Sequence, residues 1–365
     1  MPSMFDPIKM GDVTLTNRIV MAPLTRNRAV AGLKPGELTV EYYRQRASAG
    51  LIITEATQIS PMGQGYLDTP GIHSPEQVAA WKKVTAAVHG AGGHIFLQLW
   101  HVGRISHTSL LPDGASPVSS TNRRPNAKTF IADGFVDVSQ PRALRDDEIP
   151  SLIADYRHAA GYAIDAGFDG VEVHSANNYL LEQFLRDSVN DREGPYGGSM
   201  ANRARLVVEV MQAVSGEIGA GRTGIRLSPM TVFNDTPRDS DPQALYNHLV
   251  EQLAPLGLGY VHVIQGETGG SRDPDDAAVP FDYEALRGCS SGCWMVNNGY
   301  DRKDAEQAIA SGKADLVAFG RPFISNPDLV RRLREDAPLN TLREDKLYGG
   351  GAEGYTDYPT LDAAG

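Results

Sequence analysis

Short apolar runs, many of them rich in β-branched residues, recur along the chain and alternate with segments that carry helical signals. Each run is mostly apolar and ends in a polar residue, a glycine or a proline. Strands of a parallel sheet that is covered on both faces have this character. The runs predicted as strands are 19–22, 51–55, 94–99, 170–174, 223–227, 260–264, 294–297 and 316–319.

The segments between the runs begin with residues that favour helix starts. Ser74, followed by Pro75 and Gln77, offers an N-cap, a proline in the first turn and a capping-box partner. The Asp-Pro pair at 241–242 and the Asn-Pro pair at 326–327 predict two further helix starts. Repeated strand–helix units of this kind are typical of α/β folds with a parallel sheet.

Eight such units predict a (β/α)8 TIM barrel, formed by one domain over residues 1–365. A doubly wound sheet is the alternative, but no G-x-G-x-x-G turn follows the first run, which disfavours it. Residues 5–20 contain a predicted hairpin that closes the bottom of the barrel. Stretches rich in Pro, Asp and Ser at 103–147 and 266–282 are predicted to be long loops.

Composition and charge narrow the class of protein. Of the 365 residues, 41% are hydrophobic and 22% charged, as in an ordinary soluble domain. The net charge of −11 argues against binding to nucleic acid or anionic lipid. We see no secretory signal and no apolar run near the roughly 18 residues of a membrane helix. Cys289 and Cys293 are too few for a disulfide framework or a metal site, which favours a reduced, cytoplasmic protein.

Polar residues stand where several predicted strands end, which is where such barrels place their chemistry. His174 ends one run, and a helix-like turn brings Asn177 to the same side, so both can donate to one oxygen. Tyr179 has a phenol that can supply a proton. Gln98 offers a donor and an acceptor to a ring edge, and Arg226 is predicted to point into the barrel. Each residue taken singly also fits a structural role, and a buried Arg226 needs a carboxylate or an anionic ligand nearby.

Glycines and an arginine follow the last two predicted strands. Gly299 comes after the seventh run, and Gly320 with Arg321 comes after the eighth. Backbone N–H groups exposed at glycine, together with a guanidinium, suit a phosphate at this part of a barrel.

These residues belong to longer segments that match a known family. The segments are NRIVMAPLTR at 17–26, QLWHVGR at 98–104, HSANNYLLEQF at 174–184, DREGPYGGS at 191–199 and FGRPF at 319–323. The sequence resembles the old yellow enzyme family of FMN-dependent ene-reductases, and within it the bacterial N-ethylmaleimide and pentaerythritol tetranitrate reductases. The resemblance covers nearly the whole chain.

The resemblance implies a role for individual residues. His174 and Asn177 would bind the oxygen that activates the substrate, and Tyr179 or a water molecule would donate the proton. Noncovalently bound FMN would be reduced by NADPH or NADH, and the substrate would be a small electrophile such as an enone, a maleimide or a nitro compound. The positions expected around the flavin are Pro23, Leu24, Thr25, Ala56, Gln98, Arg226, Asn298, Gly299, Gly320 and Arg321, and those around the substrate are Tyr66, Trp100 and Tyr348.

Two other readings remain open from the residues alone. A flavin-free barrel isomerase or aldolase acting on a phosphorylated metabolite would use the same phosphate loops, but no lysine stands at a predicted strand end. A noncatalytic binding barrel is the third reading. The protein is expected to act as a monomer or homodimer, without a nucleic-acid or membrane partner.

Overall fold

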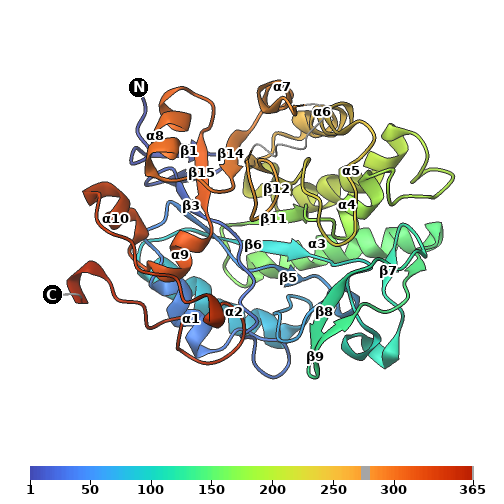
Figure 1. The fold of residues 1–365 in the computed structure, drawn as a ribbon, viewed down its shortest axis with the longest axis horizontal. Helices are drawn as coiled ribbons and strands as arrows, with labels where there is room; N and C mark the ends of the chain where they lie inside the picture. Colours follow the sequence, from blue (N-terminus) through green and yellow to red (C-terminus); the bar gives the residue numbers. More distant parts are fainter. Residues whose placement is uncertain (273–279, 364–365) are drawn as a thin grey trace.

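A closed barrel of parallel strands forms the centre of the computed structural model, which describes residues 1–272 and 280–363 (Figure 1). Neighbouring strands pair in parallel around the ring, and the pairing of β6 with β11 closes it. The barrel strands are β3 (Ile19–Met21), β4 (Leu51–Ile53), β6 (Ile95–Trp100), β11 (Gly170–Ser175), β12 (Thr223–Leu227), β13 (Tyr260–Ile264), β14 (Cys293–Asn297) and β15 (Leu316–Phe319). The predicted TIM barrel is therefore confirmed, and each predicted run overlaps one of its strands, although β6, β11 and β14 each extend one residue beyond the run.

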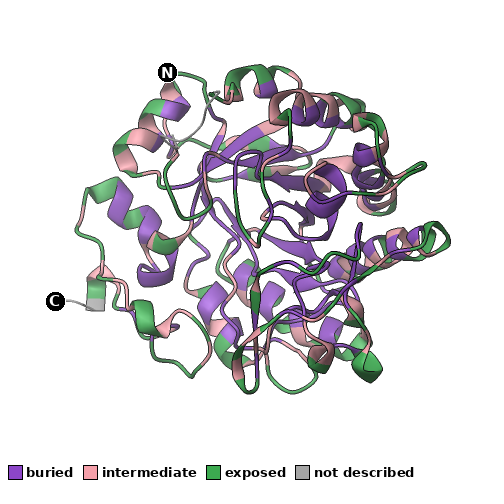
Figure 2. Ribbon diagram, turned by 45° about the vertical axis from the view of Figure 1, so that its right-hand side comes forward, coloured by how far each residue is buried: buried purple, intermediate pink, exposed green. Residues whose placement is uncertain are grey.

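Helices follow the barrel strands and cover the outside of the ring (Figure 1). Their outward faces are exposed, and the strands they cover are buried (Figure 2). The α-helices are α1 (Glu37–Arg44), α2 (Pro75–Gly90), α3 (Ile149–Asp165), α4 (Leu180–Leu185), α5 (Met200–Ile218), α6 (Pro242–Leu253), α7 (Tyr283–Gly288), α8 (Arg302–Ala310), α9 (Arg321–Ser325) and α10 (Leu329–Glu335). Among residues 1–272 and 280–363, we find no helix with the length and apolar character needed to cross a membrane.

Two of the three predicted helix starts are confirmed. The Ser74 hydroxyl accepts the backbone N–H of Gln77 at the start of α2, and the Asp241 carboxylate caps α6 in the same way. The start at 326–327 is wrong, because α10 begins at Leu329 after Asp328. The Asn326 side chain bonds instead to neighbouring and distant backbone, including the N–H of residue 340, so it is unavailable as a cap.

The bottom of the barrel is sealed by the predicted N-terminal hairpin. Its strands β1 (Ile8–Met10) and β2 (Val13–Leu15) pair in an antiparallel register. Met10 and Leu15 are completely buried and pack in one apolar cluster with barrel residues such as Phe96. Side chains therefore fill the interior at the end of the barrel where the strands begin. A ligand can bind only at the opposite end, where the strands finish.

The segment 103–147 is more structured than the predicted loop. It contains a hairpin of β8 (Lys128–Ile131) and β9 (Gly134–Asp137), which is at the lower right in Figure 1. Its alternating side chains bury Thr129 and Ile131 against the body of the protein. The predicted loop over 266–282 lies partly outside the described residues. The remaining short strands are β5 (Thr57–Gln58), β7 (Val118–Ser119) and β10 (Arg142–Ala143), and the 3₁₀ turns are Pro61–Gly63, Thr108–Leu110, Pro112–Gly114, Asp146–Glu148, Ala220–Arg222, Ala254–Leu256, Glu344–Lys346 and Leu361–Ala363.

Candidate active site

Toward the carboxyl ends of the barrel strands, a layer of polar side chains replaces the apolar interior. Gln98 on β6 lies opposite Glu172 on β11, and Arg226 on β12 lies between His174 and His262 in the strand register. All of these residues are buried. Because alternate residues of a strand face the same side, the strands bring five polar groups from distant parts of the chain into one layer.

Glu172 is the centre of this layer. Its carboxylate accepts hydrogen bonds from Gln98 Nε2 at 2.7 Å and Tyr260 Oη at 3.1 Å, and it lies 2.8 Å from His262 Nδ1. Burial acts to raise the pKa of Glu172, but His262 and Arg226 outweigh this effect and lower it. The buried carboxylate thus remains an anion because the Arg226 charge and several hydrogen-bond donors surround it.

Arg226 has the carboxylate neighbour that its burial required. Burial lowers the pKa of Arg226, and the charge of Glu172 opposes this shift. Its Nη2 donates to Asn297 Oδ1 at 2.8 Å, while its Nε is buried without a partner among the described residues. One edge of the guanidinium is therefore bound to the protein, and another donor remains for a ligand.

His174 is neutral at the inner end of the site. Burial lowers its pKa well below 6.5, and the charges of Arg226 and His262 act in the same direction. Its side chain is 3% exposed, and its Nδ1 has no partner in the described part of the chain. A neutral imidazole can donate one hydrogen bond without carrying a charge.

Asn177 reaches the site through a left-handed turn, which corrects the helix-like turn predicted from the sequence. Asn177 and Asn178 have φ angles of 55° and 61°. Asparagine adopts this region more readily than most residues. Side chains from outside the turn stabilise it. The N–H of Asn177 donates to Ser228 Oγ at 2.7 Å, and the N–H of Asn178 donates to the Glu182 carboxylate at 2.5 Å.

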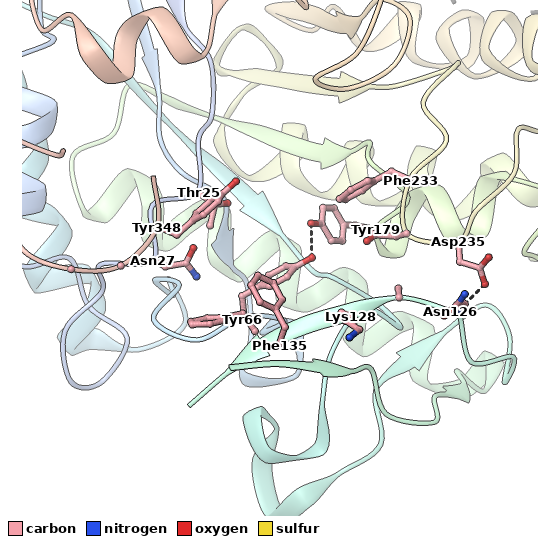
Figure 3. A pocket seen from close by; sticks show the side chains of 15 residues that line it. Thr25, Asn27, Tyr66, Asn126, Lys128, Phe135, Tyr179, Phe233, Asp235 and Tyr348 are labelled. Carbon is pink, nitrogen blue, oxygen red and sulfur yellow. Dashed lines mark hydrogen bonds between the residues drawn. The ribbon is translucent and has the colours of Figure 1, made fainter. Parts of the chain in front are cut away.

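Four aromatic rings pack together beside this turn. Tyr66 stacks on Trp100 with ring centroids 5.8 Å apart, and Tyr179 meets Trp100 edge-on at 5.0 Å. His174 lies 5.4 Å from Tyr179. The hydroxyls of Tyr66 and Tyr179 are 3.1 Å apart, as the dashed line in Figure 3 marks. Burial raises the pKa of Tyr66 to about 12 and that of Tyr179 well above 10, so both phenols keep their protons at neutral pH.

A cavity of about 920 Å³ opens above these rings. Thr25 and Tyr348 border one side, Tyr66 and Tyr179 point into it, and Phe135 from the β8–β9 hairpin lies next to Tyr66 (Figure 3). Of the residues predicted to shape the substrate pocket, Tyr66 and Tyr348 line this cavity, and Trp100 packs directly behind Tyr66. The volume is sufficient for a small organic molecule.

The loop that carries Thr25 is tied to the C-terminal part of the chain. Arg26 donates from Nε to the carbonyl of Leu347 at 2.9 Å, and Arg28 Nη2 donates to that of Lys346 at 3.1 Å. Tyr348 follows directly and is 66% exposed at the cavity. These contacts join the first and last parts of the site. Of the other positions expected near the flavin, Pro23 and Ala56 are buried and Leu24 is partly buried.

The predicted phosphate positions come together at the ends of two neighbouring strands. Gly299 follows β14, and Gly320 and Arg321 follow β15, which pairs with β14. Gly299 has φ 62°, and a Cβ built there meets nothing within 4 Å. The Asn298 side chain points elsewhere, because its Nδ2 donates to the carbonyls of Gln265 and Glu267. Asn298 therefore has only its backbone to offer a phosphate.

The donor set fits a flat, polar, phosphate-bearing ligand such as FMN. Buried nitrogens of Trp100, His174 and Arg226 lack protein partners in the described residues. Buried polar atoms normally have partners, so such a group of donors at one barrel end indicates a ligand. The open space at Gly299 is compatible with the phosphate of such a ligand. In contrast, we find no group of three or more His, Cys, Asp or Glu arranged for a metal ion within the described ranges.

Comparison with known proteins decides the family. The model of the NADH:flavin oxidoreductase / NADH oxidase family matches residues 3–340. The chain belongs to the old yellow enzyme family. This is an FMN-dependent family that uses NADH or NADPH as reductant. The family membership favours the flavin-dependent reading over the flavin-free isomerase or aldolase and over the noncatalytic barrel.

Similar proteins come from plants and bacteria. The chain is 47% identical over 362 residues to 12-oxophytodienoate reductase 1 of Oryza sativa subsp. japonica, covering 98% of this chain and 92% of the relative. It is 43% identical over 363 residues to 12-oxophytodienoate reductase 2 of Arabidopsis thaliana, covering 98% and 95%. Among solved structures, morphinone reductase in complex with tetrahydroNAD matches with a TM-score of 0.93 and 44% identity, covering 100% of this chain and 99% of that one. The old yellow enzyme homologue of Zymomonas mobilis matches with a TM-score of 0.94 and 44% identity, covering 99% and 100%.

Several residues that build the site were not predicted from the sequence. Glu172, which accepts from Gln98, and Asn297, which accepts from Arg226, are not among the residues that the sequence indicated. Thr268 was also missed, although its hydroxyl contacts Asn177. The alternation of Glu172 with His174 on one strand was the available signal, since it places a carboxylate on the same face as a proposed catalytic residue.

Proposed function

We propose that the protein reduces carbon–carbon double bonds activated by a carbonyl, imide or nitro group, using bound FMN and NADPH or NADH. Membership of a flavin-dependent oxidoreductase family supports the cofactor. Relatives are named for reducing 12-oxophytodienoate and morphinone, and both names carry a keto oxygen. A substrate with an oxygen that accepts hydrogen bonds suits the donors at His174 and Asn177.

Residues from several strand ends would hold the flavin. When bound, FMN would supply the hydride transfer between the nicotinamide and the electrophilic carbon of the substrate. Thr25 and Gln98 would bind the ring edge, and Arg226 would place positive charge beside it. The backbone at Gly299 and Gly320, with the Arg321 side chain, would bind the phosphate. The remaining proposed ring contacts are Pro23, Leu24 and Ala56, with Asn298 contributing its backbone.

His174 and Asn177 would bind the activating oxygen of the substrate. Negative charge develops on this oxygen as hydride reaches the β-carbon, so two donors already in position lower the barrier. Because His174 is neutral, its imidazole donates one hydrogen bond to this oxygen and keeps its proton. Removing one such donor typically costs about 3 kcal/mol of transition-state stabilisation.

Tyr179 would donate the proton to the α-carbon. Its hydroxyl lies 3.1 Å from that of Tyr66, and both tyrosines line the cavity. A phenol whose pKa lies well above 10 keeps its proton until charge develops next to it. Tyr66 can pass its own proton to Tyr179 afterwards, which would connect the donor to solvent.

The position of neutral, buried His174 beside the Tyr179–Tyr66 pair carries this proposal. The test uses the FMN-loaded protein under anaerobic conditions. NADPH or NADH should bleach the yellow colour, and 2-cyclohexen-1-one should restore it with formation of the saturated ketone. In the double variant His174→Ala/Asn177→Ala, the protein should remain yellow but lose enone reduction.

Two results would contradict the proposal. One is a protein that stays colourless after incubation with FMN. The other is normal enone turnover by the double variant, which would remove the oxygen-binding role from His174 and Asn177. The variant Glu41→Ala, on the exposed face of α1, is the matched control for general effects of substitution.

A further inference from the structure

The carboxamide of Asn177 is held by a residue from a different part of the barrel. Thr268, in the segment after β13, donates from its hydroxyl to Asn177 Oδ1 at 2.6 Å. A carboxamide has an acceptor oxygen at one end and an NH₂ donor at the other. With the oxygen bound to Thr268, the donor end is directed away from this contact. Within the described residues, Asn177 Nδ2 makes no hydrogen bond, so it is available to a ligand.

The geometry supports the hydroxyl as donor in this contact. A distance of 2.6 Å is typical of O–H···O and short for N–H···O, which favours the oxygen of the amide facing Thr268. Thr231 completes the arrangement, because its Oγ1 lies 3.0 Å from Thr268 Oγ1 and accepts the Thr268 backbone N–H at 3.2 Å. Thr231 is 1% exposed, and its own proton has two acceptors other than Asn177: Thr268 Oγ1 and the carbonyl of Gly266 at 3.4 Å. The Thr268 proton is then left for Asn177.

The backbone of Asn177 is fixed separately. Its N–H donates to Ser228 Oγ at 2.7 Å, and the Ser228 hydroxyl contacts the buried Glu182 carboxylate at 3.0 Å. These contacts fix the backbone that carries the side chain, whereas the orientation of the amide depends on its terminal torsion. This torsion is broad and nearly two-fold, so the two amide orientations are separated mainly by their hydrogen bonds.

We propose that Thr268 is a positioning residue that holds the Asn177 amide with its donor end toward the substrate oxygen. This inference rests on the proposed function, in which Asn177 donates to that oxygen. Without the Thr268 hydroxyl, the Asn177 amide also adopts the reversed orientation, in which its oxygen faces the substrate. The amide oxygen and the substrate oxygen are both acceptors, so no hydrogen bond forms between them. The reaction is slowed because negative charge develops next to the amide oxygen.

The test is a double-mutant cycle on the FMN-loaded protein. Thr268→Val removes the hydroxyl at nearly constant shape, Thr268→Ser keeps it, and each is made alone and with Asn177→Ala. Thr268 is exposed, so the exchange does not open a core cavity. We expect Thr268→Val to lower kcat/KM for 2-cyclohexen-1-one about tenfold, mainly through kcat, because the amide then also turns its oxygen toward the substrate and part of the stabilisation by this donor is lost. Thr268→Ser should restore the rate.

A binding measurement accompanies the rates. The oxygen of 4-hydroxybenzaldehyde phenolate carries a charge like that on the reacting substrate, and its binding is followed through the flavin absorbance. Thr268→Val should weaken this binding, and the effect should vanish when Asn177 is already alanine. The FMN content and the melting temperature of each variant report on folding. Should Thr268→Val lose FMN, Thr268→Ala takes its place in the cycle.

The outcomes separate the two proposals. If Asn177→Ala leaves enone reduction unchanged, the proposed oxygen-binding role of Asn177 is wrong. If Asn177→Ala slows the reaction but Thr268→Val behaves like Thr268→Ser, the positioning role of Thr268 is overturned. Equal losses from Thr268→Val with and without Asn177 also overturn it, since the hydroxyl would then support only the loop.

Discussion

Glu182 on α4 and Arg186, the residue directly after this helix, form an ion pair at 2.9 Å with both side chains completely buried. The Glu182 carboxylate also accepts from Ser228 Oγ, the Tyr246 hydroxyl and the backbone N–H of Asn178. The pair therefore supports the left-handed turn that carries Asn177. Its removal affects stability and the geometry of the site together.

Glu182→Ala is expected to leave Arg186 as an unpaired buried cation. Breaking a buried pair in this way typically lowers the free energy of unfolding by about 3–5 kcal/mol. The matched control is Glu41→Ala, which breaks the exposed Glu41–Arg44 pair at 2.7 Å and should cost about 0–1 kcal/mol. Urea unfolding of both variants measures the difference, and equal losses would contradict the assigned importance of the buried pair.

Tyr179→Phe tests the proton donor. Loss of a positioned general acid typically slows a reaction by about 10²-fold or more, so enone turnover should fall while NADPH still bleaches the flavin. Tyr66→Phe is the matched control, since it removes the other hydroxyl of the 3.1 Å pair and keeps Tyr179. Its effect should be smaller. Nearly normal turnover by Tyr179→Phe would assign the proton to water.

His101 predicts how stability changes with pH. Burial lowers its pKa from 6.5 to about 3, so the folded protein keeps His101 neutral where the unfolded chain is protonated. The unfolded state then binds one more proton, and stability from this site falls by about 1.4 kcal/mol per pH unit as pH drops from 6.5 toward 3. His101 Nδ1 accepts the N–H of Gly103 at 3.0 Å, and the oxygen of Asn can replace it.

His101→Asn should therefore have a flatter dependence of stability on pH. Melting temperatures of the wild type and the variant measured between pH 7 and pH 4 check this. The wild type should lose more stability than the variant toward low pH, whatever the difference at pH 7. Parallel curves would show that His101 is protonated in the folded state.

Gly299→Ala tests the phosphate position. Gly299 has φ 62°, which disfavours a Cβ by about 1–2 kcal/mol, and the open space around it is where the ligand is proposed to bind. We expect weaker FMN binding, measured by quenching of flavin fluorescence in titrations of the apoprotein. Gly216→Ala, in α5 with equally open space around its Cβ, is the control and should raise stability by about 0.5–1 kcal/mol. If Gly299→Ala leaves the affinity for FMN unchanged, the phosphate does not bind at this glycine.

Local patterns were sufficient to predict the barrel. Apolar runs reveal buried parallel strands because such strands are covered on both sides, and the caps at Ser74 and Asp241 act on N–H groups only three residues away. His174 and Arg226 were also correctly predicted to lie near the carboxyl ends of their strands, where the register places them side by side. These features depend on short stretches of sequence, which is why they can be read without the fold.

The partners within the site could not be read in this way. Glu172 meets His262 across 90 positions of sequence, and Thr268 meets Asn177 across 91. Asn326 looked like a helix cap, but contacts with a distant segment use its side chain instead. A residue's chemistry and its neighbours along the chain follow from the sequence pattern. Which of several possible partners a buried polar group selects depends on the closure of the barrel, because that closure alone sets the distances between groups far apart in the chain.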